Sequence, residues 1–140
     1  MKQKTKIVID TNIFVASLFG DTSRKIIELW LSGKVNLCIS EPIVGEYKEI
    51  LRRFKFKDEE MISRVKDAIE RNVNVCFIQR PEEKEWIPED PDDNKFIACA
   101  LALGADYVIS SDSHLLKKLK WNGIKVIRPN EFIQNIDLNI

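Results

Sequence analysis

The sequence is poor in the residues that usually cross-link a small protein or bind a soft metal. It contains three cysteines, Cys38, Cys76 and Cys99, and a single histidine, His114. An odd number of cysteines without a Cys-x-x-Cys or Cys/His cluster excludes the usual kind of zinc site. Because each cysteine lies in an apolar run, we expect buried thiols in a reducing cytoplasm. A nucleophilic triad would have to use His114, so the sequence favours catalysis by carboxylates.

Long apolar segments are also absent. The longest, residues 96–105, is well short of the ~18 residues that a membrane span needs. The basic start of the chain is followed by an apolar run that stops at Asp10, too short for a signal peptide. With 140 residues, of which 44% are hydrophobic and 31% charged, we expect one globular domain over residues 1–140. We expect it to be cytoplasmic, without membrane association.

The chain has no net charge, since 22 basic residues balance 22 acidic ones. The charges are nevertheless separated along the sequence. Seven acids and one lysine lie within residues 82–93, whereas residues 113–128 contain four lysines, one arginine and no acid. This separation predicts either an acidic site beside a basic surface or two solvated faces without a function.

Strands and helices alternate along the chain. Five short runs rich in β-branched residues predict strands at residues 6–10, 35–40, 73–78, 106–110 and 124–128. Helical spacing predicts two short helices around Gly20, the second ending at Gly33, and further helices at 41–54, 58–71, 91–102, 112–119 and 129–134. This order indicates an α/β fold with a mostly parallel sheet, whose sites form at the carboxyl ends of strands where the strand order reverses.

Carboxylates occur at these positions. Asp10 follows the first predicted strand, Asp112 follows the fourth, Asp93 opens the helix before the fourth strand, and Glu46 lies on the helix after the second. Taken singly, the aspartates could cap helices and Glu46 could be a surface residue. Together they come from four segments that this fold would bring to one edge, and clustered carboxylates are tolerated around Mg²⁺ or Mn²⁺. Such ions support phosphodiester cleavage.

The four segments resemble the motifs of the PIN domain family of nucleases, in order and over nearly the whole chain. They are Ile7-Val8-Ile9-Asp10-Thr11-Asn12, Ser40-Glu41-Pro42-Ile43-Val44-Gly45-Glu46, Asp93-Asn94-Lys95-Phe96-Ile97-Ala98-Cys99-Ala100 and Ala105-Asp106-Tyr107-Val108-Ile109-Ser110-Ser111-Asp112. The resemblance implies a three-layer α/β/α fold around a central parallel five-stranded sheet of order 3-2-1-4-5. The reversal would then lie between the first and fourth strands.

The resemblance also implies a site and an activity. Asp10, Glu46, Asp93 and Asp112 would be the catalytic metal ligands, and Thr11, Asn12 and Ser111 would orient them or the phosphate. The implied reaction is Mg²⁺- or Mn²⁺-dependent cleavage of single-stranded or structured RNA by an endoribonuclease. The implied partners are RNA, a cognate antitoxin and a second copy of the chain in a homodimer. The antitoxin is implied because many small relatives are toxins.

One position departs from the family pattern. Many relatives carry another acid two residues after the fourth one, and here that residue is His114. Imidazole is a poorer Mg²⁺ ligand than carboxylate, so a second metal position would be weaker. His114 could instead contact phosphate or be an exposed helix residue. Asp90 and Asp92 lie close to Asp93 in sequence and could assist it or only cap the helix.

Two basic stretches could hold RNA. Arg52 and Arg53 open the first, in which cations alternate with Phe54 and Phe56, and the second contains Lys117, Lys118 and Lys120 before Trp121. Cations neutralise phosphates and aromatic rings stack on unpaired bases. The alternative is a solvated loop in each case, with Phe54 and Trp121 packed in the core.

Three other functions fit an α/β fold with acids at strand ends. A signalling receiver domain needs paired acids after the first strand and an aspartate after the third, but Asp10 stands alone and Gln79-Arg80 follow the third strand. A phosphatase with an aspartate nucleophile needs an acid two residues after Asp10, where Asn12 stands. A PIN fold that only binds RNA or a partner remains an alternative, and Mn²⁺ binding to wild type and Asp10→Asn would distinguish it.

Overall fold

Five parallel strands form the centre of the structure, a computed structural model that describes residues 4–20, 22–55, 58–117, 120–121 and 123–137. They are β1 (Thr5–Ile9), β2 (Val35–Ser40), β3 (Val75–Ile78), β4 (Tyr107–Ile109) and β6 (Ile124–Ile127). Their order in space is β3-β2-β1-β4-β6, and all of these neighbours are parallel. The predicted order 3-2-1-4-5 is therefore confirmed, with the reversal between β1 and β4.

A short sixth strand was not predicted. β5 (Lys120–Trp121) pairs antiparallel with β6 at the edge of the sheet. Gly123 has a φ of 85°, a left-handed conformation that returns the chain from β5 to β6 in a tight turn. The edge beside β6 is therefore a short hairpin.

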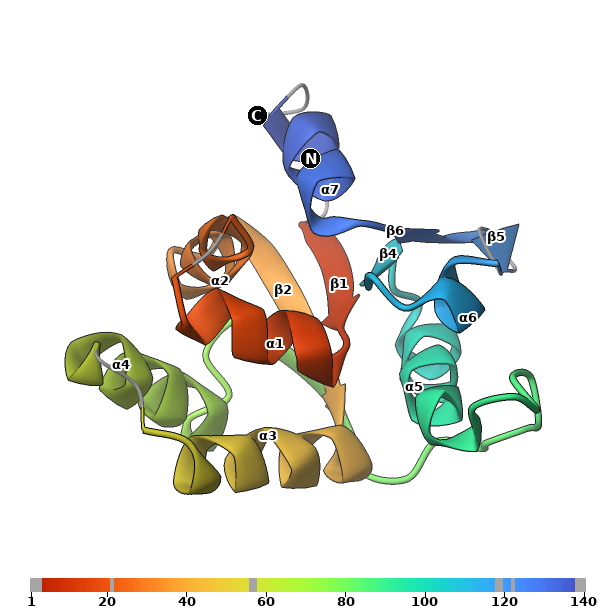
Figure 1. The fold of residues 1–140 in the computed structure, drawn as a ribbon, viewed down its shortest axis with the longest axis horizontal. Helices are drawn as coiled ribbons and strands as arrows, with labels where there is room; N and C mark the ends of the chain where they lie inside the picture. Colours follow the sequence, from red (N-terminus) through yellow and green to blue (C-terminus); the bar gives the residue numbers. More distant parts are fainter. Residues whose placement is uncertain (1–3, 21, 56–57, 118–119, 122, 138–140) are drawn as a thin grey trace.

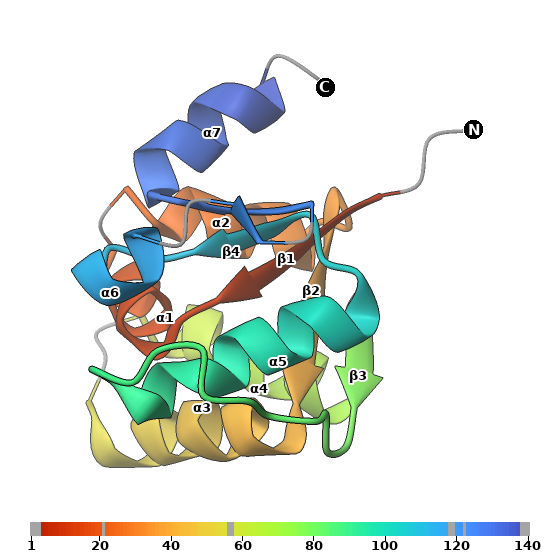
Figure 2. The ribbon, with the colours of Figure 1, turned by 90° about the vertical axis from the view of Figure 1, so that its right-hand side faces the viewer.

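Helices cover both faces of the sheet, as the three-layer prediction requires. Figures 1 and 2 show α5 (Asn94–Leu103) on one face, and Figure 1 shows α1 (Thr11–Leu18) and α2 (Arg24–Leu31) on the other. α3 (Glu41–Arg53) packs against β2, α1 and α5, and α4 (Glu59–Glu70) against α2 and α3. α7 (Pro129–Asp137) packs against α2. The single-turn segments η1 (Pro91–Asp93) and α6 (Ser113–Leu116) lie beside the carboxyl ends of the strands.

The strand β1 carries apolar side chains on both of its faces because the core lies on both sides of it. Ile7, Val8 and Ile9 are fully buried, because β1 lies in the middle of a sheet that is covered on both faces. Cys38 and Cys99 are buried free thiols, as predicted. Cys76 is only half-buried, because β3 is an edge strand with β2 as its sheet neighbour.

Some boundaries differ from the prediction. α6 ends at Leu116 rather than at residue 119, α7 continues to Asp137, and β3 begins at Val75 rather than at residue 73. The last difference has a local cause, since Asn72 and Asn74 adopt left-handed φ values of 54° and 53°. A turn therefore replaces the first two residues of the predicted strand.

Within the residues that the structure describes, no helix has both the length and the apolar character of a membrane span.

Candidate metal centre

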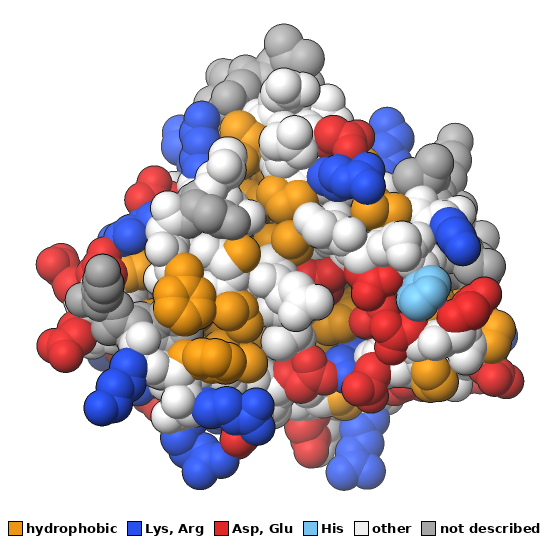
Figure 3. Space-filling model, viewed as in Figure 1, with side chains coloured by type: hydrophobic (Ala, Val, Ile, Leu, Met, Phe, Trp, Pro, Cys, Tyr) orange, Lys and Arg blue, Asp and Glu red, His pale blue; other side chains and the backbone are white. Residues whose placement is uncertain are grey.

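The carboxyl ends of β1 and β4 open onto an acidic pocket. The backbone N–H of Asp10 still donates to the carbonyl of Ile109 at 3.1 Å, so Asp10 leaves the sheet directly beside the end of β4. The pocket has a volume of about 250 Å³ and is lined by Asp10, Thr11, Asn12, Glu46, Asp90, Asp92, Asp93, Lys95, Phe96 and Asp112. Figure 3 shows acidic side chains gathered on this part of the surface. All four acids of the predicted set thus line one cavity.

Asp10 is a buried anion with a structural task. Its side chain caps α1, since Oδ1 accepts a hydrogen bond from the N–H of Ile13 at 2.9 Å, while Oδ2 accepts one from the Ser110 hydroxyl. The residue is only 3% exposed. Burial raises the pKa of Asp10 from 3.8 to about 6, against the lowering effect of both hydrogen bonds, and the charges of Asp112 and Glu46 raise it further. A nearby cation would therefore stabilise the ionised form.

Ser110 is a site residue that the sequence reasoning missed. It is fully buried, donates to Asp10 and accepts from the N–H of Asp112 at 2.9 Å, so it joins the two aspartates. Ser111, predicted to orient an acid or the phosphate, is exposed and lines a neighbouring hollow. The register of β1 and β4 could have indicated the contact between Ser110 and Asp10. Ile9 pairs with Ile109, so the next residues, Asp10 and Ser110, face each other.

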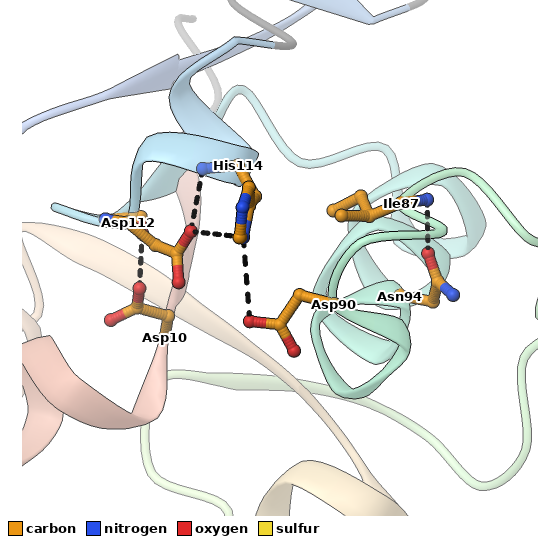
Figure 4. Close-up of polar contacts among 7 residues, drawn as sticks. Asp10, Ile87, Asp90, Asn94, Asp112 and His114 are labelled. Carbon is orange, nitrogen blue, oxygen red and sulfur yellow. Dashed lines mark hydrogen bonds and ion pairs between the residues drawn. The ribbon is translucent and has the colours of Figure 1, made fainter.

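Asp112 lies between Asp10 and a histidine (Figure 4). It caps α6 by accepting from the N–H of His114 at 2.7 Å. Nδ1 of His114 is 3.6 Å from Asp112 Oδ1 and 3.9 Å from Asp90 Oδ2, and this buried nitrogen has no hydrogen-bond partner in the described structure. Among the described residues, Asp90, Asp112 and His114 are the group of metal-ligand side chains whose donor atoms all lie within 4.8 Å of one another.

Asp93 carries a carboxylate oxygen without a partner. Its backbone stands at the start of α5, but its side chain makes no capping hydrogen bond. Oδ2 is buried and unpaired among the described residues. Burial raises the pKa of Asp93 from 3.8 to about 7, and the negative charges of Asp112 and Asp90 add to the effect. The helix-dipole interpretation does not account for this buried oxygen, whereas a bound cation would.

Asp90 and Asp92, the two acids just before Asp93, differ in the exposure of their side chains. The side chain of Asp92 is 94% exposed and lies within η1, so it does not cap α5 as one interpretation supposed. Asp90 is half-buried and faces His114 (Figure 4). The segment is held in place by Asn94, whose buried Oδ1 accepts from the N–H of Ile87 at 2.9 Å. The sequence left open whether Asp90 assists Asp93 or only caps the helix. In the structure Asp90 lies on the side of the loop that faces the pocket.

Glu46 faces the pocket from α3 and has partners at both oxygens. Oε1 accepts a hydrogen bond from the Thr11 hydroxyl, and Oε2 forms an ion pair with Nζ of Lys95. Thr11 therefore holds one oxygen of Glu46 in place, while Asn12 is exposed at the rim of the pocket. Lys95 was not predicted, although a lysine within the apolar sequence of residues 94–103 was a visible signal.

The predicted RNA-binding residues are more dispersed. Arg52 and Arg53 are exposed at the end of α3, where both pair with Glu49. Phe54 beside them is 39% exposed, so it is not a core residue. Lys117 is exposed, whereas Lys118 and the side chain of Lys120 lie outside the described residues.

A second hollow lies beside the pocket and shares Asn12 with it. Ser111 and Arg128 are among the residues that line this hollow. Arg128 therefore brings a cation of the basic segment 113–128 close to the acidic pocket.

The donor set fits a hard divalent cation. Asp10, Asp93 and Asp112 offer carboxylate oxygens, and burial opposes ionisation of two of these acids. One oxygen of Asp93 and one nitrogen of His114 are buried and have no partner in the part of the chain that the structure describes. Mg²⁺ and Mn²⁺ prefer such oxygen ligands, and Mn²⁺ also accepts an imidazole nitrogen. A cation bound there would remove the electrostatic cost of the cluster.

Comparison with known proteins agrees with this geometry. A family model described as a PIN domain matches residues 6–114, which contain every acid of the pocket. The chain is also 32% identical to an uncharacterized protein, MJ1680, of Methanocaldococcus jannaschii, over 97% of this chain and 94% of that protein. Proteins with a PIN domain are generally nucleases and typically bind divalent metals. The chain therefore belongs to the PIN domain family.

Proposed function

We propose that this protein is a Mg²⁺- or Mn²⁺-dependent endoribonuclease whose active site is the acidic pocket at the ends of β1 and β4. The observation that carries the proposal is the buried oxygen of Asp93, which has no partner among the described residues and shares the pocket with Asp10 and Asp112. Burial raises the pKa of Asp93, and the charges of Asp112, Asp90 and Asp10 raise it further. Such an arrangement is costly unless a cation is bound. A divalent ion held there would activate a water molecule and stabilise the leaving oxygen of a phosphodiester.

The residues of the chain have separate tasks in this proposal. Asp10, Asp93 and Asp112 hold the ion, and Ser110 fixes Asp10 and Asp112 relative to each other. Thr11 orients Glu46, the fourth acid of the set. Asp90 and His114 close the side of the pocket next to Asp112. Because Asp10, Asp93 and Asp112 stand at the starts of helices and Thr11 holds Glu46 on α3, these groups are positioned before substrate arrives.

RNA as the substrate is supported by the surface beside the pocket. The hollow lined by Asn12, Ser111 and Arg128 shares Asn12 with the pocket, so a strand in the pocket can extend toward a cation. Arg128 would neutralise a phosphate one or a few nucleotides from the scissile bond. The predicted cognate antitoxin, homodimer and toxin role stay predictions, and a neighbouring reading frame for a small antitoxin would test the toxin role.

The test compares cleavage of a labelled single-stranded RNA with that of a DNA of the same sequence. We expect cleavage of RNA in Mn²⁺ or Mg²⁺, no cleavage in excess EDTA, and recovery when Mn²⁺ is restored. Asp93→Asn should lose the activity, whereas Glu89→Gln, an exposed acid of the same segment outside the pocket, should retain it. Mn²⁺ and RNA binding without cleavage would instead favour the binding-module alternative, and cleavage in EDTA would refute the proposal.

A further inference from the structure

The acidic pocket contains a positive charge of its own. Lys95 lies on the first turn of α5, in a helix that is otherwise apolar, and its side chain is only 11% exposed. Its ammonium pairs with Glu46 Oε2 and lies 3.9 Å from Asp92 Oδ1 and 5.6 Å from the centre of the Phe96 ring. Lysine is almost never buried to this extent unless it is paired, so the ion pair is a built part of the pocket.

This lysine divides the acids of the pocket into two groups. Glu46 has a hydrogen bond at one oxygen and an ammonium at the other, so its charge is compensated within the chain. Asp10 and Asp93 form no ion pair among the described residues, and one oxygen of Asp93 has no partner. The negative charge that no side chain compensates therefore lies on Asp10 and Asp93, and the charge of Asp112 acts on both of them.

The two sides differ in what they offer to a divalent ion. An ion bound against Glu46 would lie beside the ammonium of Lys95, and the repulsion grows with the product of the two charges. On the other side, Asp90, Asp112 and His114 bring three donor atoms within 4.8 Å of one another. Figure 4 shows Asp10 on the other side of Asp112 from His114 and Asp90.

We propose that the pocket binds a single divalent ion beside Asp112, and that Lys95 supplies the second positive charge of the site by holding Glu46. This inference rests on the proposed nuclease function and specifies its metal content. Lys95 is accordingly a positioning residue, which acts through Glu46 and keeps that side of the pocket free of metal. A phosphate of the substrate entering there would meet an ammonium instead of a second metal ion.

The test is a calorimetric titration of the metal-free protein with Mn²⁺, which reports both the number of ions and their affinity. Wild type and Lys95→Arg should bind one ion per chain, because both keep the cation. Lys95→Met should bind a second ion, since removal of the ammonium releases the carboxylate of Glu46. Lys95→Met with Glu46→Gln should return to one ion, because the released carboxylate is then absent.

Single replacement of the acids gives a test that does not depend on the folding of Lys95→Met. Glu46→Gln should weaken Mn²⁺ binding no more than about tenfold, whereas Asp112→Asn should weaken it roughly 100-fold or more. Thermal unfolding of each variant shows whether it is folded. Two ions on wild type, or equal losses in Glu46→Gln and Asp112→Asn, would overturn the inference while leaving the nuclease proposal intact. Absence of any Mn²⁺ binding to wild type would refute both.

Discussion

At the residue scale, Asp10 shows that a capping role and a role in the site are compatible. One oxygen caps α1 through Ile13, and the other joins Ser110 and faces the pocket. The sequence indicated both roles for Asp10 and could not decide between them, because a cap and a metal ligand occupy the same place after a strand. In the folded chain the two features occur together, because the carboxylate that caps α1 also lines the pocket with Glu46 and Asp112.

Asp10→Asn should stabilise the metal-free protein at pH 8. A pKa raised from 3.8 to about 6 corresponds to about 3 kcal/mol against folding of the ionised form. Asparagine keeps the cap but weakens the contact with Ser110 by about 1 kcal/mol, so the expected gain is about 2 kcal/mol. Urea unfolding measures it.

The pH dependence provides the control for this variant. Because the folded-state pKa of Asp10 lies above the unfolded-state value, the native protein binds the proton more tightly, and stability falls as pH rises from about 4 to about 6. The pKa of Asp93 is also raised, to about 7, so the stability of the folded protein continues to fall at higher pH. The advantage of Asp10→Asn should therefore shrink as the pH falls below about 6, and an equal gain at pH 5 and pH 8 would contradict the electrostatic cause.

His114 should affect the choice of metal. Its Nδ1, which has no hydrogen-bond partner among the described residues, faces Asp112 and Asp90, and an imidazole nitrogen suits Mn²⁺ better than Mg²⁺. We expect His114→Ala to weaken Mn²⁺ binding by about tenfold and to change Mg²⁺ binding much less. Calorimetry with both metals measures the difference, and Ser113→Ala on the same exposed turn is the control. Equal losses for the two metals would show that His114 acts only through packing.

At the scale of elements, the segment before α5 supplies three of the six acids that line the pocket, Asp90, Asp92 and Asp93. The sequence placed Asp93 at the start of α5 and the four acids at one edge of the sheet, because hydrophobic runs and strand ends follow local periodicity. It could not place Lys95 or Asn94, since their partners, Glu46 and Ile87, are brought to them only by the folded chain. Similarly, β5 has two residues, too few to produce a periodic signal.

Asn94→Ala should loosen the acidic segment. The variant removes the acceptor of the Ile87 N–H, which is a buried hydrogen bond, and should lower the free energy of unfolding by about 1–3 kcal/mol. Because the same segment carries Asp90, Mn²⁺ binding should weaken as well. Urea unfolding and hydrogen exchange of the Ile87 amide measure the two effects. Protection of that amide equal to wild type would contradict this role for Asn94.

At the scale of the whole molecule, the separation of charge seen in the sequence becomes a relation between two neighbouring hollows. The acids of residues 82–93 supply three side chains of the pocket, and Arg128 of the basic segment lines the hollow next to it. The sequence left open whether this separation means an acidic site beside a basic surface or two solvated faces, and its RNA-binding prediction named Lys117, Lys118, Lys120, Arg52 and Arg53. Arg128 could not be singled out, because its place depends on how β6 ends next to β4 and α1.

Arg128→Ala should weaken binding of single-stranded RNA. Loss of one phosphate contact should reduce the slope of log affinity against log salt by roughly 0.7. Lys34→Ala is the matched control, since Lys34 is exposed just before β2, at the opposite end of that strand from the pocket. Mn²⁺ binding should be unchanged in both variants. A salt slope equal to wild type in Arg128→Ala would show that RNA takes another path, such as past Arg52 and Arg53.

The measurement that tests the central claim most directly is the single-turnover rate of RNA cleavage by Asp10→Asn in Mn²⁺. The substitution keeps the cap of α1 and should leave the fold at least as stable as wild type, so a loss of rate cannot come from unfolding. If the pocket is a metal-dependent nuclease site, we predict a rate roughly 1,000-fold or more below wild type. A wild-type rate would show that Asp10 is only a helix cap and would contradict the account.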